Sequence, residues 1–220
     1  MTAGEVAPTG DPLPARRAVS IATAALARPA DRRVDADPVD PAAPGSLPGS
    51  LPGSLPDSLL GSLPERDLDA YELRDLVASL AARPDLWAPH VAFTDDTRHY
   101  VSLHRDGHVD IWVLCWTPRN DTGWHDHDVS SGAVAVVDGE LVESNLSLMG
   151  AAVQTVVGAG NAYCFGPDHI HRLSGHSAGA VSIHAYSPPL WRMGQYAVAA
   201  DGVLRRTSVS YADELRPVSA

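Results

Sequence analysis

The 220-residue chain is predicted to contain an all-β domain, a closed antiparallel barrel or jelly roll, preceded by a short helical segment and a disordered N-terminal arm. Short apolar or alternating segments recur after residue 99, and turns rich in Gly, Asn and Asp separate them, which is typical of such folds. The composition also changes near residue 65. Residues 1–64 contain 11 of the 18 prolines and none of the 13 Trp, Tyr and Phe residues.

The arm, residues 1–64, is rich in Pro, Gly, Ser and Ala. Residues 45–56 are three tandem copies of Gly-Ser-Leu-Pro, and two further units, the first of them imperfect, follow and end at Pro64. A proline at every fourth residue removes the backbone donors that helices and sheets need. Without aromatic side chains, the arm buries too little surface to offset the entropy of ordering it. We therefore expect disorder over residues 1–64 and one folded domain over residues 65–220.

The domain begins with a helix and continues with strands. Apolar residues recur near helical spacing from Leu68 to Leu80, and Pro84 ends the pattern, which predicts a helix over about residues 67–82. The spacing then changes to a period of two and to short apolar runs. The expected strands are 100–104, 109–116, 132–137, 140–144, 153–157, 162–165, 169–173, 180–186 and 203–210.

Composition excludes several functional classes. The 16 basic residues are all arginine, and 27 acidic residues give a formal net charge of -11, which disfavours nucleic acid or an anionic membrane surface as the main partner. No apolar run is long enough to span a bilayer. The two cysteines, Cys115 and Cys164, lie in apolar runs, so we expect them in the core of a reduced, cytoplasmic protein.

The histidines of the domain are spaced for metal binding. His125 and His127 are separated by one residue, and His169 and His171 repeat this spacing downstream. Because residues i and i+2 of a strand point to the same face, each pair presents two imidazoles side by side. Alternating histidines on a solvated face would need no function, but two such pairs in one barrel favour a metal site.

A third alternating group follows, since Ser182, His184 and Tyr186 also share one strand face. Imidazole ligands suit Zn, Cu, Fe and Ni. Neither cysteine lies at ligand spacing from a histidine pair, which argues against a structural zinc site. Three neutral imidazoles without a carboxylate would leave coordination positions open for a substrate and dioxygen.

Three blocks of sequence carry a family resemblance. Residues 123–127, Gly-Trp-His-Asp-His, with Val-Asp-Gly-Glu-Leu at 137–141, resemble the first cupin motif. Gly132 stands where most cupins have a glutamate ligand, as in bacterial members of the cysteine dioxygenase type I family. Residues 170–173, Ile-His-Arg-Leu, and 180–189, Ala-Val-Ser-Ile-His-Ala-Tyr-Ser-Pro-Pro, are similar to further segments of that family. So is the block from Arg98 to Leu-Cys-Trp at 114–116.

The resemblance covers about residues 67–200 and implies a cupin double-stranded β-helix with a mononuclear Fe(II) site. His125, His127 and His171 are the implied ligands. His171 is preferred to His169 because it directly precedes an arginine in the matching motif. Arg98 is implied to bind the substrate carboxylate, because a guanidinium makes a bidentate contact that lysine cannot copy.

The same resemblance assigns catalytic roles to the third histidine group. Tyr186 is implied to place its hydroxyl over the iron and the bound thiol or dioxygen. His184 would hold that hydroxyl by a hydrogen bond, and Ser182 would orient His184. Family members with a cysteine at the position of Gly132 join it covalently to the tyrosine, so Gly132 implies an unmodified Tyr186.

The implied activity is the addition of both atoms of dioxygen to the sulfur of a small thiol. L-Cysteine is the first expectation, with cysteine sulfinic acid as product, because a related branch that oxidises 3-mercaptopropionate has Gln in place of the arginine. The alternatives are another thiol substrate, or a non-catalytic cupin that binds a metal or ligand. A zinc or manganese isomerase would be expected to keep the glutamate ligand. The expected partners are a thiol and O2, and the expected state is a monomer.

Overall fold

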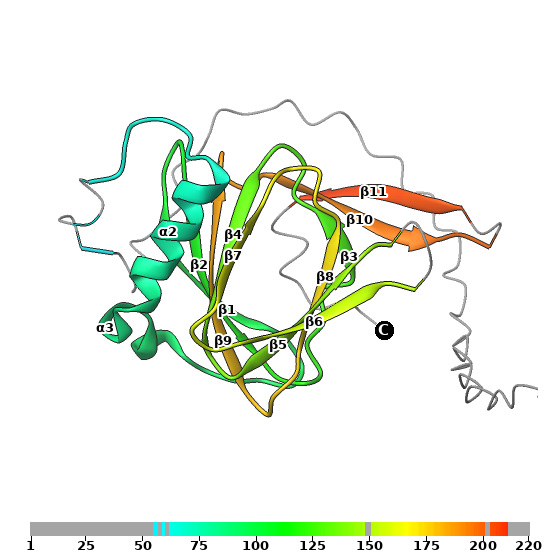
Figure 1. The fold of residues 1–220 in the computed structure, drawn as a ribbon, viewed down its shortest axis with the longest axis horizontal. Coiled ribbons are helices and arrows are strands. Elements are labelled where there is room, and N and C mark those ends of the chain that lie inside the picture. Colours follow the sequence, from blue (N-terminus) through cyan, green and yellow to red (C-terminus); the bar gives the residue numbers. More distant parts are fainter. Residues whose placement is uncertain (1–54, 57–58, 60–61, 148–150, 201–202, 211–220) are drawn as a thin grey trace, which may run out of the picture. The chain divides into compact units, whose positions relative to one another are not determined.

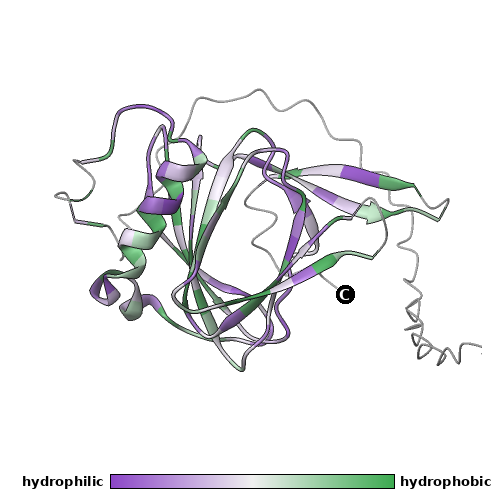
Figure 2. Cartoon of the chain, viewed as in Figure 1, coloured by the Kyte–Doolittle hydropathy of each residue, from purple (hydrophilic) through white to green (hydrophobic). Residues whose placement is uncertain are grey.

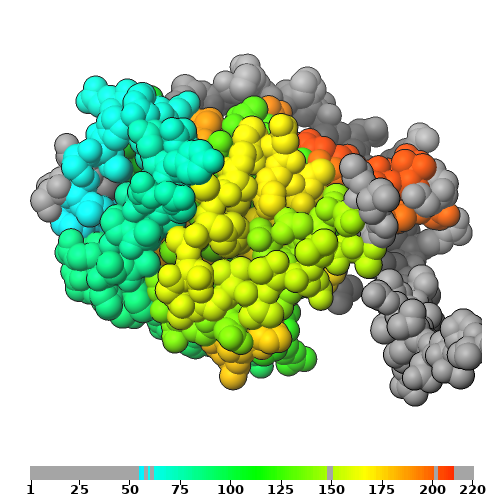
Figure 3. Space-filling model, in the orientation of Figure 1, coloured from blue at the N-terminus to red at the C-terminus, as the bar shows by residue number. Residues whose placement is uncertain are grey.

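A computed structural model describes residues 55–56, 59, 62–147, 151–200 and 203–210, all within the compact unit formed by residues 48–220. Two antiparallel sheets face each other across the barrel (Figure 1). The first has the order β1-β2-β9-β4-β7, formed by His99–Arg105, Asp110–Trp116, Ala180–Ser187, Ser131–Asp138 and Ala162–Phe165. Side chains fill the space between the sheets on the face shown in Figure 3.

The second sheet contains His125 and His171. Its order is β11-β10-β3-β8-β5-β6, formed by Leu204–Ser210, Arg192–Val198, Trp124–Asp126, His171–Gly175, Glu140–Asn145 and Val153–Gly158. All pairings in both sheets are antiparallel. The fold is a cupin double-stranded β-helix, as the sequence predicts.

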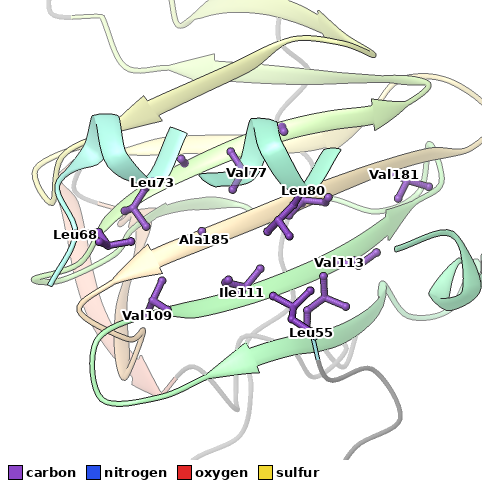
Figure 4. Packing of buried hydrophobic residues seen from close by; sticks show 14 of the residues in the cluster. Leu55, Leu68, Leu73, Val77, Leu80, Val109, Ile111, Val113, Val181 and Ala185 are labelled. Atoms are coloured by element: carbon purple, nitrogen blue, oxygen red, sulfur yellow. The ribbon is translucent and has the colours of Figure 1, made fainter. Parts of the chain in front are cut away.

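Helix α2, Ala70–Ala81, covers the outer face of the first sheet. Asp69 caps its N-terminus by accepting hydrogen bonds from two backbone N–H groups, and Glu72 bonds back to the cap, which completes a capping box. Polar and apolar residues alternate along the helix (Figure 2). Its buried side chains Leu73, Val77 and Leu80 pack on the sheet (Figure 4). Two short helices follow, α3 at Pro84–Trp87 and η1 at Ala88–His90.

The folded domain begins earlier than the predicted boundary at residue 65. Leu55 is only 3% exposed and belongs to the core cluster beneath α2, and Leu59 and Leu63 pack against the same cluster (Figure 4). The Leu55 N–H also donates to the Leu103 carbonyl. The apolar leucines of the last repeats therefore supply the buried surface that we expected the arm to lack. Residues 1–54, which hold most of the predicted disordered arm, lie outside the described residues.

Two strands have no counterpart among the expected elements. Strand β3 has only three residues, and strand β10 carries no strict alternation of apolar and polar residues. The strand expected at 169–173 begins instead at His171 and ends at Gly175, because a turn closed by the His169 N–H and the Gly166 carbonyl precedes it. The peptide bond between Ser187 and Pro188 is cis. Among the described residues, no helix has the length and apolar character needed to cross a membrane.

Candidate metal centre and active site

Three histidines, carried by β8, by β3 and by the loop directly after β3, converge in the interior of the barrel. His125 on β3 pairs directly with His171 on β8, and His127 follows β3. Their ring centroids lie 4.7 to 5.1 Å apart, and one ligand atom from each lies within 4.8 Å of the others. All three side chains are buried. The structure thus brings together the three residues that the family resemblance implies as metal ligands.

Hydrogen bonds on the far side of two rings orient them toward the centre. The Nδ1 atom of His171 lies 2.9 Å from Oε1 of Glu143, and Nδ1 of His125 lies 3.1 Å from the carbonyl oxygen of Gly123. Since both partners can only accept, Nδ1 carries the hydrogen in each ring. The Nε2 lone pairs therefore remain for another partner.

Several buried nitrogens of the cluster have no hydrogen-bond partner among the described residues. They are Nε2 of His171 and both ring nitrogens of His127. Buried polar atoms in folded proteins are nearly always paired, so such a group needs an explanation. A metal ion bound by three imidazoles fits these residues, because it would satisfy the nitrogens that converge.

The protonation state of the cluster also suits a metal. Burial and, to a smaller extent, the neighbouring His171 lower the pKa of His125 to about 3. Burial likewise lowers the pKa values of His127 and His171. All three rings are therefore neutral at pH 7, which is the form that binds metals.

Glu143 connects His171 to the other histidine considered from the sequence. Its Oε1 atom lies 2.9 Å from Nδ1 of His171 and 3.2 Å from Nε2 of His169. Burial raises the pKa of Glu143, but the hydrogen bonds from both histidines outweigh burial and lower the pKa to about 2. Glu143, His169 and His171 form a second group with ligand atoms close together. Glu143 lies on the Nδ1 side of His171, so it does not occupy the centre shared with His125 and His127.

A chain of hydrogen bonds leads from Trp116 to the hydroxyl of Tyr186. The Trp116 Nε1–H donates to Ser182 Oγ at 2.8 Å, Ser182 Oγ lies 2.9 Å from His184 Nε2, and His184 Nδ1 lies 3.1 Å from the Tyr186 oxygen. Indole can only donate, and burial lowers the pKa of His184 well below 6.5, so the ring is neutral. In the tautomer in which the Ser182 hydroxyl donates to Nε2, His184 donates from Nδ1 to the Tyr186 oxygen, and the phenol hydrogen is left for another acceptor.

These groups border a cavity of about 50 Å³. Its lining includes Arg98, His125, His184 and Tyr186 together with the apolar side chains of Leu190 and Met193. The Arg98 guanidinium lies over the Trp116 ring, 4.8 Å from its centroid. A small molecule in this cavity would contact one imidazole of the histidine cluster, a phenol and a fixed positive charge.

The side chains of Phe165 and Tyr186 leave no room for a side chain at Gly132. A Cβ atom at this position would lie 2.4 Å from Cε2 and 2.5 Å from Cζ of Phe165, and 3.1 Å from Cδ1 of Tyr186. Phe165 also stacks on His127, with centroids 4.7 Å apart. The Phe165 ring therefore fills the space next to the metal centre that a side chain at residue 132 would use.

The sequence did not single out three of these positions. Glu143 carried a usable signal, since it is an acidic residue in a segment expected to be a half-buried strand. The role of Trp116 depends on the pairing of β2 with β9, and the position of Phe165 depends on the pairing of β7 with β4. Those pairings join distant parts of the chain, and local sequence does not reveal them.

A double-stranded β-helix with three buried, converging histidines defines the class of the protein as a cupin that could hold a metal ion. A family model, cysteine dioxygenase type I, matches residues 54–198. The chain belongs to this family.

Individual proteins are also similar to the chain. It is 27% identical to cysteine dioxygenase type 1 of Danio rerio over 135 residues, which is 56% of this chain and 67% of the relative. A double-stranded β-helix protein of Klebsiella pneumoniae has a TM-score of 0.41 at 14% identity and covers 46% of this chain and 80% of its own. A cupin superfamily protein of Desulfitobacterium hafniense has a TM-score of 0.40 at 10% identity and covers 46% and 86%.

Proposed function

We propose that the chain is a non-haem Fe(II) thiol dioxygenase that converts a small thiol, L-cysteine first, to its sulfinate. The observation that supports this most is the triad of buried, neutral histidines beside a cavity that also contains Arg98 and Tyr186. His125, His127 and His171 would hold the iron. Bound iron would acidify the thiol and bring it and dioxygen together. In the balanced reaction, the O–O bond would break, both oxygen atoms would form bonds to sulfur, and the sulfur would supply the four electrons that reduce O2, so that no other reductant is needed.

The chain's own residues would bind and orient the substrate. The guanidinium of Arg98 would pair with the substrate carboxylate, and stacking on Trp116 holds that guanidinium at the cavity wall. Tyr186, held by His184 and through it by Ser182, would donate a hydrogen bond at the reacting atoms. Apolar Leu190 and Met193 would limit water. With Gly132 in place of a cysteine, Tyr186 would remain without a thioether crosslink.

The proposal assigns the third ligand to His171 and not to His169, and a pair of variants tests the assignment. His171→Ala should abolish both iron binding and activity. His169→Ala, the matched control, should retain iron, because the Nε2 atom of His169 lies against Glu143 and His169 does not belong to the group of converging ligand atoms formed by His125, His127 and His171. Iron retained in His171→Ala and lost in His169→Ala would contradict the assignment.

Oxygen uptake with purified, iron-loaded protein tests the activity and separates the rivals. The proposal predicts one O2 consumed per L-cysteine. Faster turnover of 3-mercaptopropionate would move the substrate assignment to that thiol. No uptake with any thiol would contradict the proposal and favour a cupin that only binds a metal or ligand.

A further inference from the structure

The strand that carries His125 and leads to His127 is short. β3 has three residues, which pair with β10 at all three positions and with β8 only through His125 and His171. His127 lies beyond the end of the strand. Other contacts must therefore fix the position of the loop that contains His127, since metal ligands act only when they are held close to their bonding geometry.

His127 needs this support more than its two companions. His125 and His171 each have a hydrogen-bond acceptor at Nδ1, whereas neither nitrogen of His127 has a partner among the described residues. Stacking on Phe165 and Tyr186 limits the tilt of the His127 ring. Its placement thus depends on the backbone on both sides.

Asp126, between the two histidines, supplies that backbone support. Its side chain is on the face of β3 opposite to His125, and it accepts five hydrogen bonds. Oδ1 accepts from the backbone N–H groups of Asp128 and Gly194, each at 2.9 Å. The bond to Asp128 closes a turn around His127. Asp128 itself has a φ of 55°, which an unsupported non-glycine residue rarely adopts.

The remaining three bonds come from the C-terminal hairpin. Tyr196 on β10 donates its hydroxyl to Oδ2 at 2.6 Å, and Arg206 on β11 donates from Nε to Oδ2 at 2.7 Å and from Nη2 to Oδ1 at 2.9 Å. Arg206 also bonds Asp128 at 3.2 Å. One guanidinium therefore joins both ends of the turn that contains His127.

The contact between Arg206 and Asp126 depends on close packing over Gly194. A Cβ atom at Gly194 would lie 2.2 Å from Nε of Arg206 and 2.5 Å from Oδ2 of Asp126. Only glycine at this position lets Arg206 reach the carboxylate across β10. Arg206 lies beyond residues 54–198, the part that the family model matches.

We propose that Arg206 and Tyr196 are positioning residues of the metal centre, acting through Asp126 to hold His127 in its binding geometry. The inference rests on the proposed metal site and assigns the C-terminal hairpin a role in it. Loss of the hairpin contacts should weaken metal binding even where the barrel stays folded. Outer-shell partners of this kind typically change metal affinity by about 10- to 100-fold.

The test uses the full chain, stripped of metal and titrated with Co²⁺, whose visible absorption reports the number and geometry of its ligands. Arg206→Met keeps the length of the side chain and removes its donors, so it should weaken Co²⁺ binding about 10-fold or more and change the spectrum. Arg205→Met is the matched control, because neighbouring residues of a strand point to opposite faces. It should bind within twofold of the unaltered chain. Tyr196→Phe removes one hydrogen bond and should weaken binding severalfold.

The outcomes separate the two proposals. Unchanged Co²⁺ affinity and spectrum in Arg206→Met, even with a lower melting temperature, would overturn the positioning role. If Arg206→Met does not fold, unchanged binding by the milder Tyr196→Phe overturns it instead. An unaltered chain that binds no Co²⁺ would overturn both proposals. A chain that binds Co²⁺ with the predicted variant effects, but oxidises no thiol when loaded with Fe(II), would overturn the proposed function alone.

Discussion

Replacing Gly132 by alanine is the substitution whose effect can be worked out most directly from the structure. The added methyl group would lie 2.4 and 2.5 Å from two carbons of the Phe165 ring, far inside the normal contact distance of carbon atoms. Phe165 is 6% exposed and is packed between His127 and His169, so its ring has little room to move.

The expected cost is that of an overpacked core, about 1–3 kcal/mol of unfolding free energy. The displaced ring would press on His127, so metal affinity should fall as well. Gly132→Ala/Phe165→Leu is the informative partner, because the smaller side chain at 165 makes space for the methyl group. The double variant should be more stable than the sum of the single effects by about 1 kcal/mol.

Urea unfolding of the metal-free protein, followed by circular dichroism, measures these free energies. The unaltered chain and Phe165→Leu serve as references for the cycle. Gly132→Ala with unchanged stability, or a double variant whose cost equals the sum of the two single costs, would refute the reasoning that Phe165 fills this space.

Three further predictions concern charge and hydrogen bonding at the site. The pKa of His125 is about 3 in the fold and about 6.5 when unfolded, so the unfolded state binds the proton first as pH falls. The stability of the metal-free protein should be complete above pH 6.5 and should fall by about 2 kcal/mol for this residue alone by pH 5; a melting temperature that does not change over this range would contradict the burial argument. Arg98→Gln should lower kcat/KM for L-cysteine about 10- to 100-fold, the effect of losing a charged hydrogen bond, and lower it less for cysteamine, a thiol without a carboxylate; equal losses in oxygen-electrode assays would speak against carboxylate binding by Arg98. Tyr186→Phe keeps the ring that stacks on His127, so iron content should stay unchanged while kcat falls about 100-fold; full activity would remove the hydroxyl from the mechanism.

Local sequence patterns were sufficient for much of the fold and for the histidine pairs. The helix was predicted from its periodicity, and the capping residues Asp69 and Glu72 define its start. The spacing of His125 and His127 predicts that their side chains point to the same side of the backbone. The choice between His169 and His171 could not be made from spacing, because it depends on a turn that ends just before β8 begins at His171.

Contacts between distant residues account for what the sequence did not reveal. Asp126 and Arg206 are 80 positions apart, and Glu143 precedes His171 by 28. Each is an ordinary charged residue in its own segment and gains its role only when strands pair. The folded domain begins before the predicted boundary of the arm for a related reason, since Leu55 is buried in a core cluster with residues of distant segments and its N–H donates to the Leu103 carbonyl on β1.

Mass analysis of the product formed from L-cysteine under isotopically labelled dioxygen tests the central claim most directly. The account predicts cysteine sulfinic acid with both sulfinate oxygens labelled, formed by the iron-loaded chain and absent with His171→Ala. Product that contains oxygen from water, or a disulfide in place of the sulfinate, would contradict it.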